Sequence, residues 1–411
     1  MGHDLKRFST WRRALGTAAI ITAMNAMTTP ASAQEPSFSD WLEAFRSEAA
    51  AAGIDQNVVT QAFEGVTVNE RVFELNDNQP EFSQTIWNYL DSALSTNRIE
   101  KGRTRFAQNK TLLAQIEDKY GVDAETIVAI WGLESSYGDI MGSYDAVQAL
   151  ATLAWQGRRT AYGRSQLIGL LKIIQNGYAA RDELKGSWAG AMGHTQFIPT
   201  TYLSHAIDEN ADGRRDIWSS LEDVFASTAN YLSVSGYNRD TGWGLEITLP
   251  EEFDYDLAAP STRKPVAEWA ALGVDAASGN LIGRFDPNRR GRIIVPAGAK
   301  GPAFLVFRNF EAILKYNRST SYALAVSLLS EQVAGSGGTL AKEWPRADRA
   351  LSLSERKSLQ QALIDKGFDP GPVDGVVGAG TRAALKAWQK SAGVPADGYA
   401  SADTLLRLTA E

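Results

Sequence analysis

Apolar residues recur at helical spacing along most of the chain. Near the start, Phe38, Trp41, Leu42, Phe45 and Ala49 fall on one face of a helix, which predicts an amphipathic helix there. The same periodicity returns as far as residue 332, so we expect a mainly α fold. Further helices are predicted at 85–94, 112–119, 124–133, 146–154, 166–176, 220–233, 309–314 and 321–332.

The segment between residues 243 and 302 has a different texture. Proline and glycine become frequent there, and short β-prone runs appear at 245–249 and 292–295. Such runs, bounded by turn-forming residues, predict strands. We therefore expect a small β-containing insertion in a helical domain that extends over residues 34–333.

The last part of the chain has the pattern of a separate module. A polar stretch that opens on a Gly/Ser-rich run predicts a linker at 334–350. In the module, at 351–411, Ser352 and Glu355 form a capping-box pattern ahead of the first of three short helices. So small a helical unit buries little apolar surface, and the module is either a docked appendage or a small binding domain. Its second and third helices are predicted at 381–389 and 401–408.

Residues 1–33 have the features of a signal peptide. Four cations between residues 6 and 13 precede an apolar run at 14–27, and small residues at 31–33 supply a cleavage site. The alternative is a short membrane anchor, but the apolar run is well below the roughly 20 residues that a spanning helix needs. We therefore predict export to the periplasm, with cleavage after Ala33 and no membrane anchor afterwards.

Composition narrows the function further. The chain has 411 residues, 44% of them apolar and 22% charged, as in an ordinary globular protein. It contains no cysteine, which excludes disulfides, thiolate metal sites and a lipid attached to cysteine. Its net charge of −7, which falls to −10 without the signal peptide, argues against a nucleic-acid partner because such contacts need a basic surface.

The first candidate for chemistry is Glu134. An apolar helix at 127–133 ends at this carboxylate, which is followed by small polar residues and Gly138. If the side chain is buried, the pKa of its carboxyl rises, because the charged form is poorly solvated. Glu134 would then be a proton donor suited to a leaving oxygen. The alternative is an ordinary glutamate on the exposed side of a helix end.

A second candidate segment lies at 186–202. Gly190 and Gly193 allow close approach of the backbone, while Ser187 and Gln196 offer neutral hydrogen-bonding groups beside aromatic residues. Neutral donors with aromatic surface suit sugar hydroxyl and acetamido groups better than phosphates. The alternative is a tight structural turn.

Together the two segments resemble a known family. Glu-Ser-Ser-Tyr-Gly at 134–138, followed by Ala-Gly-Ala-Met-Gly-x-x-Gln-Phe-x-Pro-Thr-x-Tyr at 189–202, is similar to the lytic murein transglycosylase B family (glycoside hydrolase family 103). The resemblance covers about residues 38–330. His194 departs from it, since family members more often have a neutral amide there. Further matching blocks lie at 141–142, 149–154, 158–159, 229–232, 309–310 and 316–323.

The resemblance implies a lysozyme-like fold and cleavage of the β-1,4 bond between N-acetylmuramic acid and N-acetylglucosamine. Glu134 is then the sole acid and base: it protonates the glycosidic oxygen and then accepts the proton of the muramyl C6 hydroxyl, which closes a 1,6-anhydro ring. No catalytic cofactor is implied. A hydrolase with paired carboxylates needs a second acidic residue opposite the first, for which Asp139 and Asp145 are the candidates.

The same matching implies the substrate-binding residues. Ser187 and Gln196 would contact the substrate near the cleavage point, and Arg159 would meet lactyl or stem-peptide carboxylates. For each tyrosine, core packing with a tethered hydroxyl is about as favourable a reading as ligand contact. The residues that would line the cleft are Tyr89, Tyr231, Tyr316, Asn317 and Tyr322.

A run of acidic and amide residues at 208–214 opens like an EF-hand loop. The usual glutamate at the twelfth position is replaced by Ser219, and some family members use a later carboxylate instead. The alternative is an Asx-rich turn. We favour a structural calcium ion, whose ligands would be Asp208, Asn210, Asp212, the carbonyl of Arg214, and Asp223.

The C-terminal module resembles the small peptidoglycan-binding domain of wall enzymes, through Asp-Gly-Val-Val-Gly at 374–378 and Thr-Arg-x-Ala-Leu-x-x-Trp-Gln at 381–389. The implied partners are peptidoglycan glycan strands, with cell-wall synthesis or division enzymes as candidate protein partners. Two other functions stay open at this point. One is a hydrolytic muramidase on the same fold, and the other is a catalytically silent wall-binding scaffold.

Overall fold

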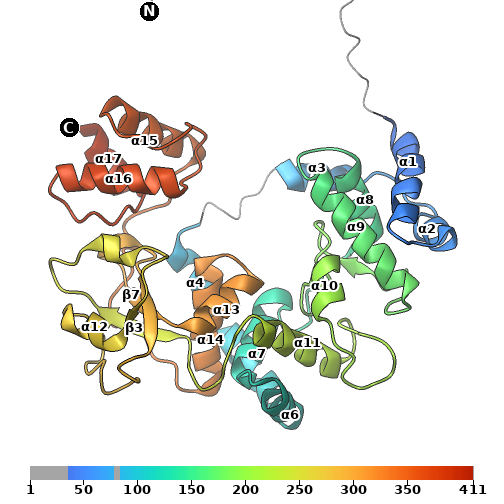
Figure 1. Ribbon diagram of the computed structural model, residues 1–411, viewed down its shortest axis with the longest axis horizontal. Helices are drawn as coiled ribbons and strands as arrows, with labels where there is room; N and C mark the ends of the chain where they lie inside the picture. The colour runs from blue at the N-terminus through green and yellow to red at the C-terminus, as the bar shows by residue number, and fades with distance from the viewer. Residues whose placement is uncertain (1–35, 78–83, 411) are drawn as a thin grey trace, which may run out of the picture.

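The computed structural model describes residues 36–77 and 84–410, so the predicted signal peptide lies outside the described residues. The elements are mostly helices, arranged as an elongated molecule (Figure 1). The predicted helices are present, with ends that differ by a few residues. In the helical domain they are α1 (Phe38–Ala51), α2 (Gln56–Ala62), α3 (Glu70–Asp77), α4 (Ile86–Ala93), α5 (Thr96–Gln108), α6 (Lys110–Tyr120), α7 (Ala124–Ser135), α8 (Ala146–Trp155), α9 (Thr160–Gln175), α10 (Pro199–His205), α11 (Leu221–Val234), α13 (Arg308–Tyr316) and α14 (Thr320–Ala334).

Helix α7 lies at the centre of this domain. Its residues from Ile127 to Ile130 are fully buried on every side, and α14, α5, α11 and α6 pack around it. A helix that is apolar all round needs such a covering, because each face must be removed from water. The result is a rigid, buried helix whose last turn carries Glu134.

The insertion contains a five-stranded antiparallel sheet with strand order β4-β6-β7-β3-β5. Two of its strands match the predicted runs, whereas β7 follows directly after the segment in which strands were expected. The insertion has its own core, which includes the fully buried Trp269 on α12 (Val266–Ala271). The strands are β3 (Gly244–Thr248), β4 (Lys264–Pro265), β5 (Asp275–Ala276), β6 (Arg290–Ile294) and β7 (Ala303–Val306), and two short 3₁₀ helices lie at Tyr255–Ala258 and Gly298–Lys300.

A second, two-stranded sheet joins the two candidate segments. Strand β1 (Tyr144–Asp145) pairs antiparallel with β2 (Lys185–Gly186). The sheet therefore ties the chain just beyond Glu134 to the chain just before Ser187. Two motifs about 50 residues apart in the sequence become neighbours in this way.

The segment between the helical domain and the C-terminal module follows the surface of the domain. Both carboxylate oxygens of Glu246 on β3 accept backbone N–H groups of this segment, at 2.7 Å from Ala341 and 2.8 Å from Lys342. Farther along, Arg346 forms a two-point ion pair with Asp91 on α4, at 2.7 and 2.8 Å. The segment is thus attached to the helical domain along its length.

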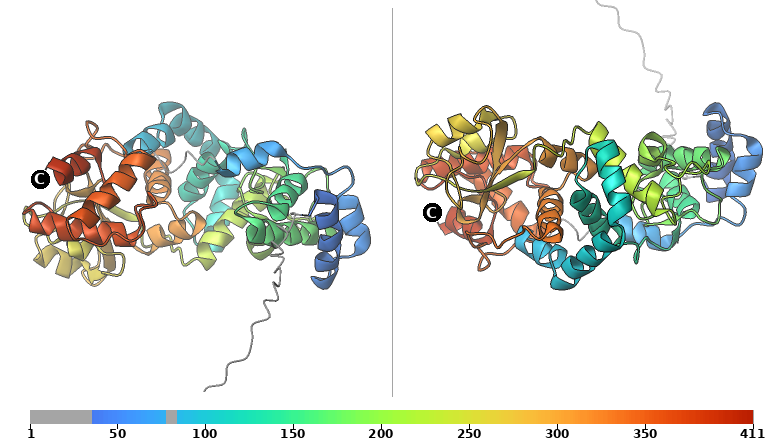
Figure 2. Two further views of the ribbon diagram at one scale, coloured as in Figure 1. Left: turned by 90° about the horizontal axis from the view of Figure 1, so that it is seen from above. Right: turned by 90° about the horizontal axis from the view of Figure 1, so that it is seen from below.

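The module itself is a three-helix unit with a separate small core, made of α15 (Leu353–Asp365), α16 (Ala379–Ser391) and α17 (Ala402–Ala410). The predicted capping box of Ser352 and Glu355 is present at the start of α15. The module sits beside the β insertion at one end of the molecule, and α1 and α2 lie at the other end (Figure 2). Among the described residues, no helix has the length and apolar character that crossing a membrane requires.

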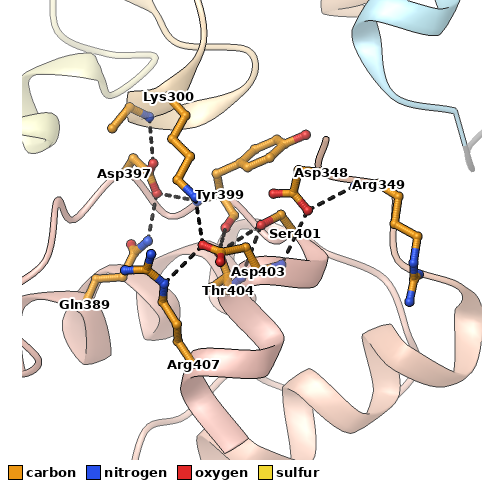
Figure 3. A network of polar contacts seen from close by, with 11 residues as sticks. Lys300, Asp348, Arg349, Gln389, Asp397, Tyr399, Ser401, Asp403, Thr404 and Arg407 are labelled. Atoms are coloured by element: carbon orange, nitrogen blue, oxygen red, sulfur yellow. Dashed lines mark hydrogen bonds and ion pairs between the residues drawn. The ribbon is translucent and has the colours of Figure 1, made fainter. Parts of the chain in front are cut away.

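Polar contacts hold the module against the insertion (Figure 3). Asp397 accepts the backbone N–H of Ala299 at 2.7 Å, and Lys300 pairs with Asp403 at 2.8 Å. At another part of the insertion, Lys386 donates to the carbonyl of Tyr255 at 2.8 Å. The module is therefore docked against the insertion as well as folded.

Candidate active site

Glu134 lies in the last turn of α7 with its carboxyl surrounded by protein. The residue as a whole is half-buried, but burial of the carboxyl raises its pKa from 4.5 to about 7. The phenol of Tyr322 on α14 donates to Glu134 Oε1 at 2.6 Å, which acts in the opposite direction because it stabilises the charged form. The carboxyl is therefore mostly neutral below pH 7, and it has a partner that supports the carboxylate when it forms.

The chain reverses sharply just after Glu134. Ser136 and Tyr137 both have left-handed backbone conformations, with φ of 52° and 62°, and Gly138 follows at 91°. Two such non-glycine residues in succession cost on the order of 1–3 kcal/mol each, so other contacts must hold the turn. Tyr137 supplies one of them, since its hydroxyl donates to the carbonyl of Arg98 at 2.8 Å and its ring fills the space above Gly132.

The turn after Glu134 packs directly on the second candidate segment. A Cβ added at Gly142, whose φ is +89°, would lie 2.2 Å from the backbone of Gly186, so only glycine allows this approach. Gln196 Nε2 donates to the carbonyl of Met141 at 3.0 Å, while its Oε1 accepts no hydrogen bond from any described residue. Ser187 Oγ accepts the N–H of Ala191 at 3.0 Å. The two motifs are thus in direct contact with each other.

Three tyrosines form a wall that leads to the carboxyl. The rings of Tyr322 and Tyr316 are stacked, with centroids 6.5 Å apart, and Tyr231 meets Tyr316 edge-on at 4.9 Å. Tyr316 donates to the carbonyl of Thr195 at 2.7 Å, which links the wall to the second segment. The three hydroxyls are tethered and Tyr322 is buried, so the wall offers a ligand the aromatic surface of Tyr316 and Tyr231.

The remaining predicted residues differ in their placement. Tyr89 on α4 lies close to Glu134. The pKa of its phenol is raised to about 12, mainly by burial and in addition by the charge of the Glu134 carboxylate. The guanidinium of Arg159 lies over the ring of Trp188, 5.6 Å from its centroid. Trp188 is the residue next to Ser187 in the sequence. Asn317 is exposed, and its Oδ1 accepts the N–H of Ser319 at 3.2 Å in the turn before α14. Its side chain therefore stabilises a turn.

Neither candidate for a second catalytic carboxylate is arranged for catalysis. Asp139 is exposed and forms an ion pair with Lys101, which lowers the pKa of its carboxyl through a hydrogen bond. Asp145 caps α8 and accepts two hydrogen bonds from Arg181, at 2.7 and 3.0 Å. Both carboxylates are committed to local structure, whereas the pKa of the Glu134 carboxyl is raised.

Sequence reasoning missed the partners of His194. Its Nδ1 accepts the indole N–H of Trp131 at 2.7 Å, and its Nε2 lies 3.1 Å from the carbonyl oxygen of Trp218. His194 was visible as a departure from the family pattern. Its partners lie 63 and 24 residues away in the chain, so local sequence gave no signal for them.

The predicted calcium loop folds around its own hydrogen bonds. Asp208 accepts the N–H of Asp212 at 3.1 Å and of Gly213 at 2.9 Å. Asp223 is fully buried, and its two oxygens accept the N–H of Glu209 at 2.8 Å and of Asp216 at 2.7 Å. Within the described ranges, no three His, Asp or Glu side chains converge as a metal-binding group. The oxygen donors nevertheless have the chemistry that suits a hard cation.

Comparison with known proteins places this geometry in a family. The model of the transglycosylase SLT domain matches residues 37–331, and the model of a putative peptidoglycan binding domain matches residues 352–408. The membrane-bound lytic murein transglycosylase B of Escherichia coli (strain K12) is 29% identical over 297 residues, which are 69% of this chain and 79% of that protein.

Solved structures are also similar. SltB3 from Pseudomonas aeruginosa in complex with NAG-anhNAM-pentapeptide is 47% identical, with a TM-score of 0.88 over 91% of this chain and 99% of that one. The Slt35 lytic transglycosylase of Escherichia coli in complex with calcium is 26% identical, with a TM-score of 0.62 over 71% of this chain and 92% of that one.

Proposed function

Since the chain belongs to the transglycosylase SLT family, we propose that Glu134 is the single acid and base with which it cleaves peptidoglycan. The protein is a lytic murein transglycosylase with a C-terminal peptidoglycan-binding domain. It breaks the β-1,4 bond between N-acetylmuramic acid and N-acetylglucosamine and leaves a 1,6-anhydro-muramyl end. The observation that carries the role of Glu134 is its buried carboxyl, whose pKa of about 7 matches the working range of a general acid.

The reaction proceeds in two proton transfers at the same carboxyl. First, the carboxyl proton of Glu134 passes to the glycosidic oxygen, and the electron pair of the C1–O bond leaves with that oxygen. The acetamido group of the muramyl residue supports C1 meanwhile, as in substrate-assisted enzymes. The Glu134 carboxylate then accepts the C6 hydroxyl proton while the C6 oxygen bonds to C1. Tyr322 stabilises the carboxylate between the two steps through its hydrogen bond.

The commitments of Asp139 and Asp145 favour this reaction over hydrolysis. A hydrolase of the paired type places a second carboxylate across the sugar to hold or replace a water molecule. Both acidic residues that follow Glu134 most closely are instead bound to cations, Lys101 and Arg181. Neither of them is then free to hold a water molecule at C1, whereas the C6 hydroxyl belongs to the same sugar and reaches C1 without a separate binding step.

The substrate lies, in this proposal, along the surface that the two motifs form. Gln196 presents its unbonded Oε1 to a sugar N–H or hydroxyl group, and Ser187 keeps its hydroxyl proton available as a donor. The partly exposed rings of Tyr316 and Tyr231 supply apolar surface for sugar faces, and the buried Tyr322 stacks behind Tyr316. Arg159 lies beside this surface as a partner for lactyl or stem-peptide carboxylates.

The setting of the reaction is the periplasm. The signal-peptide pattern of residues 1–33 supports export, and the lack of cysteine in the chain supports release without a lipid anchor. The C-terminal module brings the enzyme to the glycan strands that are its partner. Enzymes of cell-wall synthesis or division are the class of protein partner that fits this location.

A calcium ion in the loop at 208–214 is a structural part of this proposal. The related Slt35 was crystallised in complex with calcium. Here the donors would be the side chains of Asp208, Asn210, Asp212 and Asp223 with the carbonyl of Arg214, an all-oxygen set. The ion would neutralise clustered negative charge and hold the loop; it takes no part in the reaction.

Digestion of purified sacculi tests the proposed function. Wild-type protein is expected to release muropeptides whose mass is one water below that of hydrolysed fragments, and Glu134→Gln to release almost none. The control is Asp139→Asn, which removes the other nearby acid and keeps activity. Hydrated products would identify a muramidase, and equal release by Glu134→Gln would identify another catalytic residue. No release by either protein would leave a wall-binding scaffold.

A further inference from the structure

The imidazole of His194, which belongs to the substrate-binding segment, lies between α7 and the residues just before α11. On one side, Trp131 of α7 donates its indole N–H to Nδ1 at 2.7 Å. On the other side, Nε2 is 3.1 Å from the carbonyl oxygen of Trp218. The backbone N–H of His194 donates in addition to Ile217 at 2.9 Å. One side chain thus joins the helix that carries Glu134 to the chain that follows Gln196.

The two partners leave a single protonation state for the ring. An indole nitrogen only donates, so Nδ1 of His194 must be unprotonated. A carbonyl oxygen only accepts, so Nε2 must carry the proton. The ring is therefore neutral and held in one tautomer by Trp131 and Trp218.

The ring also supports the strained turn behind Glu134. A Cβ added at Gly138 would lie 2.2 Å from Cε1 and 2.7 Å from Nδ1 of His194, so the imidazole presses against this glycine. Gly138 follows Ser136 and Tyr137, the two non-glycine residues with positive φ. Trp131 stands three residues before Glu134 on the same helix. His194 therefore contacts the helix before Glu134, through Trp131, and the turn after it, through Gly138.

We propose that neutral His194 is a positioning residue that holds the turn after Glu134 in its catalytic form. The inference rests on the proposed role of Glu134. Protonation of Nδ1 would set two donors against each other and leave the N–H of Trp131 buried without an acceptor. The ring would then move away from Gly138, and the strained turn would lose that support.

The surroundings of the His194 ring favour its neutral form. Burial lowers the pKa of His194 most strongly. The carbonyl of Trp218 and the carboxylate of Asp216 raise it, and Arg105 lowers it. The pKa therefore lies below the ordinary value of about 6.5 for a histidine. Activity should then fall on the acid side as His194 is protonated, and on the alkaline side as Glu134 loses the proton it must donate.

The test compares the pH profiles of two variants with that of the wild type. Glutamine offers an oxygen acceptor and an N–H donor at a spacing similar to that of the two ring nitrogens, and it does not titrate. His194→Gln is therefore expected to move the acid limb of kcat to lower pH. His194→Leu removes the acceptor and should lower kcat about tenfold at pH 7, the scale of one unsatisfied buried donor, and His194→Gln should recover most of that loss.

His205→Gln is the matched control, because His205 is the other histidine in the described ranges and burial lowers its pKa too. Its acid limb should coincide with that of the wild type. The NMR signal of the Trp131 indole N–H can be assigned by its absence from the Trp131→Phe variant. Its chemical shift should change with pH at the same midpoint as the acid limb of kcat. If His194→Leu does not fold, the pH profile of His194→Gln and the Trp131 signal still test the positioning role.

An unchanged acid limb in His194→Gln, or an indole signal that is constant with pH, would overturn the positioning role. Neither result would affect the assignment of Glu134, which the product masses and Glu134→Gln test separately. Conversely, full activity of Glu134→Gln would show that Glu134 is not the proton donor. The alkaline limb would then need another cause, and the role of His194 would be unaffected. The two inferences can therefore fail independently.

Discussion

At the scale of single residues, the site depends on a carboxyl that is costly to charge. Glu134, Ser187 and Gln196 could be found in the sequence because each belongs to a continuous motif with a recognisable order. The hydrogen bond from Tyr322 to Glu134 joins residues 188 positions apart, so no local sequence pattern predicts it. Burial is likewise a property of the fold, which is why the sequence left two readings of Glu134 open and the structure supports one.

The raised pKa of Glu134 predicts a stability difference that depends on pH. Native Glu134 keeps its proton up to about pH 7, whereas an unfolded glutamate ionises near pH 4.5. The native state thus binds more protons in between, so stability falls as the pH rises through this window. Glu134→Gln avoids the penalty and keeps an acceptor for Tyr322. It should be more stable than the wild type at pH 8, by at most about 3 kcal/mol.

Thermal unfolding at pH 4 and pH 8 measures this difference, which should nearly vanish at pH 4. Asp139→Asn is the control, because its ion pair with Lys101 lowers the pKa of the native carboxyl. That variant should be slightly less stable than the wild type at pH 8, with the opposite sign. Equal melting temperatures of Glu134→Gln and wild type at both pH values would mean that the carboxyl is not desolvated.

At the scale of elements, prediction succeeded where apolar spacing is regular. Helices α7, α8 and α14 have many apolar positions and were predicted to within a few residues of their observed ends. Helix α5 was missed because it is mostly polar, with Gly102 as its buried residue. Strand β7 was missed because all four of its residues are buried, so it shows no alternation of apolar and polar positions. Strands β4 and β5, with two residues each, exist only through their pairing partners.

The loop at 208–214 is an element whose stability should depend on calcium. Asp208 and Asp212 lie in the loop, and Asp223 in the first turn of α11 accepts the N–H of Glu209, so a bound ion would offset the negative charge of these carboxylates. Calcium at millimolar concentration should raise the melting temperature of the wild type relative to protein in chelator. Asp212→Ala should reduce this shift, because it removes a donor that is exposed and replaceable without a core defect.

Magnesium at the same concentration serves as the control, since it demands an octahedral site and should shift the melting temperature less. Asp240→Ala, an exposed acidic residue outside the loop, should respond to calcium as the wild type does. A calcium response that is equal in Asp212→Ala and wild type would place any bound ion elsewhere. The absence of a response in the wild type would favour the Asx-rich turn.

At the scale of the whole molecule, the C-terminal module is fixed in orientation by contacts that composition does not reveal. The Gly/Ser-rich run predicted a linker, but Glu246 and Asp91 bind the segment that follows it to the helical domain. The module then meets the insertion through Asp397 and Asp403 (Figure 3). The bridge from Lys300 to Asp403 is largely solvent-exposed and should weaken with salt.

Gly298 offers the sharpest test of this docking. Its φ is +65°, and an added Cβ would lie 2.3 Å from Asp397 Oδ2 and 2.8 Å from Cβ of Tyr399. Gly298→Ala should therefore push the module away from the insertion. Gly279, in the same insertion, has a similar φ of +79° but nothing within 4 Å of an added Cβ. Gly279→Ala thus introduces comparable backbone strain without the clash, which makes it the matched control.

Small-angle scattering should report a larger radius of gyration for Gly298→Ala than for Gly279→Ala, and proteolysis in the segment at 335–350 should be faster. Cleavage of short soluble glycans should be the same in both variants, because the insertion is outside the catalytic surface. Digestion of whole sacculi should be slower in Gly298→Ala, since a docked module presents the wall to the catalytic domain in one orientation and a tethered one samples many. If the two variants digest sacculi equally while their scattering differs, the module contributes proximity alone and its fixed orientation has no part in catalysis.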